Sequence, residues 1–247
     1  LDLISVNETI SDKRLVNLPK IAVYHSWTDT QAEGWVRYTF EQLGVPYTSI
    51  DKDDLKAGRL SRDFDVIVIP HFRRGMTQFV HGVDEKFGPM PFTKTKEYPS
   101  HGYPDQTGDM TGGPGFDGIN NLNEFVKDGG VLVPLNNAAA IIADLGIGGV
   151  LRSYRSSRLF HPGSIVTAKA RNLESPILFG YPEEFHLYKG NTPMLRSDFI
   201  DRKFMVAQFG DEPLADEKPY TGEIMGLSPT SETSEEVKES GKPRKYV

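Results

Sequence analysis

Short apolar runs alternate with helix-like segments between residues 20 and 142, and this alternation limits the possible folds more than any other feature. The third run, DFDVIVIP at residues 63–70, has four consecutive apolar residues, as in a strand covered on both faces. Similar β-rich runs occur at residues 20–27 and 45–51 and within 129–142. Strands that alternate with helices pair in parallel through right-handed crossovers. We therefore predict a flavodoxin-like α/β fold with a mostly parallel sheet and helices on both faces.

Two segments of this region have clear helical spacing. Residues 28–44 carry Trp35, Tyr38, Phe40 and Leu43 before Gly44, which predicts a helix that stops at the glycine. We expect its aromatic side chains to lie in the core and not to form a binding surface. Residues 116–130 predict a second helix with one apolar face, which consists of Ile119, Leu122, Phe125 and Val126.

The interval from residue 71 to residue 115 is dense in glycine, proline and polar residues, and it predicts a long functional loop. Within it, His81, Asp84 and Glu85 have helical spacing, but we expect a solvated loop there and no metal site. The segment TGGPGFDG at residues 111–118 precedes the second helix, and glycines there free backbone N–H groups for an anion. The candidate anion site is weak, because the spacing fits no phosphate-binding fingerprint; it consists of Gly112, Gly113 and Gly115.

The remaining segments define the expected domain limits. Residues 157–170 and 175–182 predict β-structure with turns, at the edge of the sheet or in a small excursion. We expect residues 1–18 to connect to an upstream domain, 19–200 to form the α/β domain, and 201–247 to be a mobile polar segment or the truncated end of that domain. The chain begins with Leu1 and not with Met, which suggests a processed piece of a longer protein.

Composition excludes several classes of function. The chain has no cysteine, so it has no disulfide, no thiolate metal site and no thiol nucleophile. Its formal net charge of -6 provides no basic face for nucleic acid. No stretch approaches the roughly 18 consecutive apolar residues of a membrane helix, so we expect no membrane insertion.

A strand followed by a sharp polar corner and an alanine-rich helix is predicted at GGVLVPLNNAAAII, residues 129–142. Many α/β hydrolases and amidotransferases carry their nucleophile at such an elbow. The corner here holds Asn136 and Asn137, which cannot attack a carbonyl carbon. The chain also lacks a G-x-S-x-G motif, and neither FHPG nor FHLY provides a His-x-Glu pair. We therefore expect no catalytic residue at the elbow.

Polar residues follow the predicted strands where open α/β sheets bind ligands, at the carboxyl ends. Such groups, together with an exposed aromatic ring, would suit a small polar or carboxylate ligand. The alternative is that they are loop residues bonded to one another. The candidate ligand-binding residues are Ser26, Trp27, Asp29, His71, Arg73, Asn136 and Asn137.

The segments 21–70, 111–136 and 160–184, which include HSW, EGW, FEQ and FHPGS, resemble a known family. It is the class I glutamine amidotransferase-like domain found C-terminal to bacterial carboxypeptidase A-like zinc peptidases, and the resemblance covers about residues 19–185. It implies an exported protein, secreted or periplasmic, whose upstream peptidase domain holds the zinc, with no cofactor and no amidotransferase activity in this segment. Domains of this family usually end in a further strand, which this chain does not reach.

Three functional hypotheses follow. The first is a non-catalytic accessory domain that supports or positions the peptidase, or binds a small polar ligand. The second is a hydrolase or amidase that uses His71 with Asp29 or Glu33, or His81 with Glu85 and a metal. The third is a carbohydrate- or peptide-binding module that works through Trp27 and the long loop.

Overall fold

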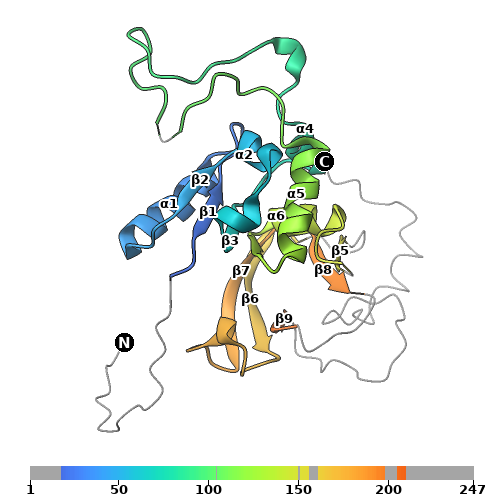
Figure 1. Cartoon of the computed structure of the whole chain (residues 1–247). Coiled ribbons are helices and arrows are strands. Elements are labelled where there is room, and N and C mark those ends of the chain that lie inside the picture. The colour runs from blue at the N-terminus through green and yellow to red at the C-terminus, as the bar shows by residue number, and fades with distance from the viewer. Residues whose placement is uncertain (1–17, 104, 150, 156–160, 198–204, 210–247) are drawn as a thin grey trace, which may run out of the picture. The chain divides into compact units, whose positions relative to one another are not determined.

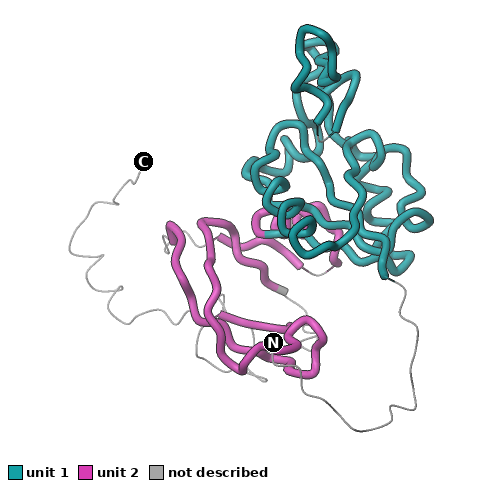
Figure 2. The backbone as a smooth tube through the Cα atoms, turned by 90° about the vertical axis from the view of Figure 1, so that its left-hand side faces the viewer, with its two compact units in different colours: residues 1–135 teal, residues 136–247 magenta. Residues whose placement is uncertain are grey.

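The computed structural model describes residues 18–103, 105–149, 151–155, 161–197 and 205–209. It divides into two compact units, residues 1–135 and 136–247, which Figure 2 shows in two colours. The predicted connector at residues 1–18 and the polar segment at 201–247 fall almost entirely outside the described residues.

A four-stranded parallel sheet organises the first unit (Figure 1). Its strands are β1 (Ile21–Tyr24), β2 (Thr48–Ile50), β3 (Val66–Ile69) and β4 (Val131–Pro134), in the order β2-β1-β3-β4. All three neighbouring pairs run parallel. This order is that of the flavodoxin-like doubly wound folds. The predicted α/β fold with a mostly parallel sheet is therefore confirmed.

The core of this unit lies between the central strands and the helices. The apolar run of β3 is buried at Ile67, Val68 and Ile69, as expected for a strand covered on both faces. Helix α5 (Gly115–Lys127) buries Ile119, Leu122 and Phe125, so the predicted apolar face is confirmed. Helix α2 (Lys52–Ala57) packs on α5, and the short helix α3 (Leu60–Asp63) also contacts it.

Helix α1 (Gln31–Leu43) ends as predicted at Gly44, which has a φ of 65°. The prediction that its aromatic residues lie in the core is wrong, because Trp35 is 65% exposed and Tyr38 is 53% exposed. The residue of this helix that is buried is Glu33. Helical spacing identifies residues that share a face, but it does not say which face the sheet covers. Here a buried ion-pair network takes the inner face.

The interval from residue 71 to residue 115 is not one continuous loop. It contains helix α4 (Met76–His81) and the 3-10 helix η1 (Glu85–Phe87), both too short to show a period in the sequence. The chain then makes a long excursion, which Figure 1 shows leading away from the sheet before it returns to α5. Val83 bridges to Thr111 and Gly112, so the start and end of the excursion lie against each other.

The second unit contains helix α6 (Asn137–Asp144) and two antiparallel sheets. One sheet pairs β5 (Leu151–Tyr154) with β8 (Met194–Ser197). In the other, β6 (Gly163–Ala170) lies between β7 (Glu184–Gly190) and β9 (Ala207–Phe209).

None of the described helices combines the length and the apolar composition that a membrane span requires.

The predicted β-structure of this unit is partly correct. Residues 163–170 form a strand, whereas residues 157–160 lie outside the described residues. The prediction for residues 175–182 is wrong, because the segment begins with the 3-10 helix η2 (Pro176–Leu178) and continues without a strand. Pro176 has no N–H group for a strand ladder, and the Ser175 hydroxyl accepts from the Ile177 N–H group, which favours a helical turn.

Candidate functional site

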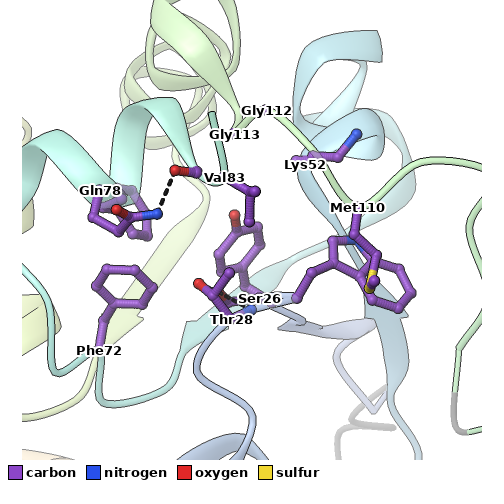
Figure 3. A pocket seen from close by; sticks show the side chains of 13 residues that line it. Ser26, Thr28, Lys52, Phe72, Gln78, Val83, Met110, Gly112 and Gly113 are labelled. Carbon is purple, nitrogen blue, oxygen red and sulfur yellow. Dashed lines mark hydrogen bonds between the residues drawn. The ribbon is translucent and has the colours of Figure 1, made fainter. Parts of the chain in front are cut away.

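A pocket opens in the first unit beyond the carboxyl end of β1 (Figure 3). Its empty volume is about 270 Å³, part of which is open to solvent. Aromatic side chains and hydroxyl groups contribute to its walls, and the lining residues include Tyr24, Ser26, Trp27, Thr28, Lys52 and Gln78. The carboxyl ends of parallel strands are where open α/β sheets bind ligands. The pocket thus lies where the sequence analysis expects a ligand.

Tyr24 is a deeply buried residue of the pocket wall, with 6% of its surface exposed. Its ring packs against Phe79 at a centroid distance of 5.6 Å. Its hydroxyl makes no hydrogen bond within the described part of the chain. Burial, and then the carboxylates of Asp51 and Asp53, raise the pKa of this hydroxyl well above its usual range. Tyr24 therefore stays protonated and can donate to a ligand.

The charged groups near the pocket are already paired. Lys52 is buried, and its Nζ atom donates to both carboxylate oxygens of Asp53 at 3.0 Å. The Asp51 carboxylate accepts from the first N–H groups of α2, and its second oxygen accepts from Trp27 Nε1 at 3.2 Å. These contacts position Trp27 and engage the charged side chains with partners inside the chain.

A buried ion-pair network lies beside this pocket, between β1, α1 and the long excursion. His25 Nδ1 lies 2.6 Å from Glu33 Oε2, and the two side chains are 4% and 3% exposed. Arg37 Nη1 donates to Glu33 Oε1 at 3.0 Å and lies 3.7 Å from Asp105 Oδ2. The Asp105 carboxylate also accepts from the Ser49 hydroxyl. The network therefore ties the excursion to α1 and β2.

His25, Glu33 and Asp105 are also a possible set of metal ligands, since their ligand atoms lie within 4.8 Å of one another. An imidazole with two carboxylates suits zinc. The Arg37 guanidinium, however, already supplies the positive charge between the two carboxylates. The arrangement favours an ion-pair network over a metal centre.

His25 Nε2 is buried and has no hydrogen-bond partner among the described residues. The imidazole ring meets the Trp27 ring edge-on at a centroid distance of 4.4 Å. The sequence analysis did not identify this histidine or Asp105 as candidate site residues. It considered Glu33 only as a possible partner of His71. The available signal was that a strand end and the first turn of the next helix are neighbours in a βα unit.

The candidate ligand residues separate into groups. Ser26 and Trp27 line the pocket. Asp29 is buried and pairs with Arg73, whose backbone N–H group and Nε atom both donate to its carboxylate. Glu33 pairs with His25 and Arg37, so both carboxylates that the sequence analysis offered to His71 are engaged by other side chains.

The residues of the metal-dependent alternative, which used His81 with Glu85, have other contacts. His81 packs edge-on against Phe116, and Asp84 pairs with Lys86 at 2.7 Å. In the described part of the chain, His81, Asp84 and Glu85 do not form a three-ligand group.

The glycines of the weak anion site have other roles. Gly112 donates its N–H group to the Val83 carbonyl, and a Cβ atom there would lie 3.0 Å from a Glu85 carboxylate oxygen. A Cβ atom at Gly113 would lie 2.4 Å from the Val80 carbonyl oxygen. Close chain packing accounts for both glycines, and the carboxylate disfavours an anion. Gly115, with a φ of 62°, begins α5.

Asn136 stands at the corner between β4 and α6 with a φ of 54° and a ψ of -120°. Non-glycine residues rarely adopt this backbone conformation, which is strained. Asn136 is exposed, and it belongs with Asn137 to the second unit, whereas the pocket belongs to the first. The predicted elbow thus exists locally, with an amide side chain at its corner.

No family model matches this sequence, and no curated protein is detectably similar to it. Among solved structures, a glutamine amidotransferase from Thermotoga maritima has a TM-score of 0.44 and 8% identity, over 74% of this chain and 64% of that chain. A putative ThuA-like protein from Bacteroides uniformis has a TM-score of 0.41 and 13% identity, over 77% and 65%. A putative ThuA-like protein from Parabacteroides merdae has a TM-score of 0.40 and 11% identity, over 78% of this chain and 68% of that chain.

The chain spans less than two thirds of the length of the first two of these structures. Its own topology, a parallel sheet in the order β2-β1-β3-β4 with helices between the strands, assigns it to the flavodoxin-like α/β folds.

Proposed function

We propose that this chain is a non-catalytic, amidotransferase-like domain that binds a small polar ligand in the pocket of its first unit. The observation that carries the non-catalytic part of the proposal is the corner at Asn136, where the backbone has a φ of 54° and a ψ of -120°. A strained strand-to-helix corner is where α/β hydrolases expose their nucleophile. Here the corner carries an amide, and the whole chain contains no cysteine that could replace it.

The resemblance over residues 19–185 supports a more specific setting. In this setting the chain accompanies a zinc carboxypeptidase-like domain of the same polypeptide, in a secreted or periplasmic bacterial protein, and supports or positions that domain. The zinc ligands, a His-x-x-Glu pair and a later histidine, then belong to the peptidase domain. This chain contains no His-x-x-Glu pair.

The first test is an ammonia-release assay on the purified chain. The rate of ammonia release from glutamine and simple amides is expected to equal the rate in buffer alone, because no nucleophile stands at the elbow. Asn136→Ala is the matched variant and is expected to leave that rate unchanged. Ammonia release by the wild type that disappears in Asn136→Ala would contradict the non-catalytic assignment.

The buried pair of His25 and Glu33 favours a second candidate, a hydrolase in which a carboxylate orients a histidine base. A substrate would not reach this histidine easily, since His25 is 4% exposed and does not line the pocket. The same assay separates the two candidates: amide hydrolysis that survives Asn136→Ala and is lost in His25→Ala would favour the hydrolase. Stoichiometric zinc after dialysis would favour its metal-dependent form.

The accessory role predicts a division of activity between the two parts of the parent protein. The full-length polypeptide is expected to release C-terminal amino acids from peptides, and a zinc chelator is expected to abolish that release. Residues 1–247 alone are expected to show neither activity nor stoichiometric zinc, as measured by peptide mass spectrometry and metal analysis. A full-length protein without peptidase activity would contradict the accessory role and leave the ligand-binding proposal standing.

A further inference from the structure

We infer that the pocket of the first unit selects an uncharged, hydroxyl-bearing ligand, such as a single sugar ring, and discriminates against anions. The inference rests on the proposed function, because it specifies the chemistry of the same pocket. It follows from which polar groups of the pocket are occupied, which remain available, and which charges surround them.

The charged side chains are occupied by partners within the chain. Lys52 holds both oxygens of Asp53 at 3.0 Å. The Asp51 carboxylate is shared between the start of α2 and Trp27 Nε1. A charged ligand would have to compete with these contacts, whereas a neutral ligand would not.

The groups that remain available are neutral. The Tyr24 hydroxyl is nine-tenths buried and makes no hydrogen bond within the described residues. The hydroxyls of Ser26 and Thr28 hydrogen-bond to each other at 3.4 Å, so one of the two O–H groups can still donate to a ligand, and Figure 3 shows these side chains close together. Gln78 donates its amide N–H to the Gly82 carbonyl, which leaves the side-chain carbonyl oxygen as an acceptor. Hydroxyl groups, which both donate and accept, match this set.

The surrounding charges oppose an anion. Burial first, and then the carboxylates of Asp51 and Asp53, disfavour a negative charge on the Tyr24 hydroxyl. The Glu85 carboxylate adjoins Gly112, another residue of the wall. The rings of Trp27 and Phe79 complete the lining with apolar surface, which suits the C–H groups of a sugar ring.

The test compares D-glucose with D-glucuronate, which share a ring and differ in one group, a CH2OH or a carboxylate. Titration calorimetry on the purified chain is expected to show that glucose binds. The affinity for glucuronate is expected to be at least about tenfold lower, which is the size of effect expected when a polar contact is lost or becomes repulsive. Glucose is also expected to raise the melting temperature, and the rise should continue with the logarithm of the glucose concentration above Kd.

Tyr24→Phe keeps the ring and removes only the hydroxyl, so it is expected to weaken glucose binding by about three- to tenfold. Tyr38→Phe, the same change on an exposed residue outside the pocket, is expected to leave the affinity unchanged. Ser26→Ala is a second variant of the wall that does not alter the core. Circular dichroism verifies that each variant is folded before titration.

The outcomes separate the inference from the proposed function. Glucuronate that binds as tightly as glucose, or wild-type affinity in both Tyr24→Phe and Ser26→Ala, would overturn the inference and leave a ligand-binding domain. Absence of binding by both sugars would also overturn it. The proposed function would fall as well only if amino acids, dicarboxylates and inorganic phosphate likewise gave no thermal shift.

Discussion

Replacement of Gly82 by alanine is expected to destabilise the first unit by about 3 kcal/mol or more, because a backbone clash adds to left-handed strain. Gly82 has a φ of 64°, and a Cβ atom there would lie 1.9 Å from the Gly112 carbonyl oxygen. Both glycines line the pocket, so the two chain segments would separate at the proposed binding site. Urea denaturation followed by circular dichroism measures the loss in the free energy of unfolding. Titration calorimetry measures the expected loss of affinity for glucose.

Gly88→Ala is the matched control for this variant. Gly88 has a similar φ of 71°, but nothing lies within 4 Å of the position that a Cβ atom would take. Only the left-handed strain applies, so the expected cost is about 1–2 kcal/mol. Equal losses in the two variants would show that the close approach of Gly82 to Gly112 does not limit stability.

Removal of the buried carboxylate at residue 33 is the second substitution with a large expected effect. Glu33→Ala leaves the His25 imidazole and the Arg37 guanidinium without their shared buried acceptor. The breaking of a buried ion pair from one side costs about 3–5 kcal/mol. We therefore expect a loss of about 3 kcal/mol in the free energy of unfolding, measured by urea denaturation, with looser attachment of the excursion that carries Asp105.

Two further variants make this result specific. Glu33→Gln keeps the size and one acceptor oxygen, and it is expected to lose less stability than Glu33→Ala. Glu41→Ala removes an exposed carboxylate of the same helix, and its expected cost is below about 1 kcal/mol. A similar small loss at both acidic positions would mean that the network around His25 contributes little to stability.

The strands and the longer helices were predictable from the sequence. The apolar run of β3 and the face of α5 with Ile119, Leu122 and Phe125 are repeated local patterns, and burial of apolar area stabilises the structure that they predict. Helices α4 and η1 were not predictable, since three to six residues are too few to show a period. At residues 175–182, the turn chemistry of Ser175 and Pro176 outweighed the apolar content.

The general position of the candidate site was also predictable, because topology places the ends of parallel strands at one edge of the sheet. That reasoning identified Ser26 and Trp27, which line the pocket. It did not identify Tyr24, whose apolar strand context makes it look like an ordinary core residue. It also did not identify Lys52, which begins α2 and reaches the pocket with its charge paired.

The sequence by itself determined the class of fold and the absence of a nucleophile at the elbow. Both depend on local properties: the period of apolar residues along each element, and the identity of the residues at the corner, Asn136 and Asn137. Only the tertiary structure decided that Asp29 pairs with Arg73, that His25 pairs with Glu33, and that Asp105 approaches Arg37 from the excursion. These contacts join residues up to 68 positions apart, and each polar group had several possible partners of opposite charge. Residue type shows that a buried charge needs a partner, but only the packing of the whole unit shows which partner comes within reach.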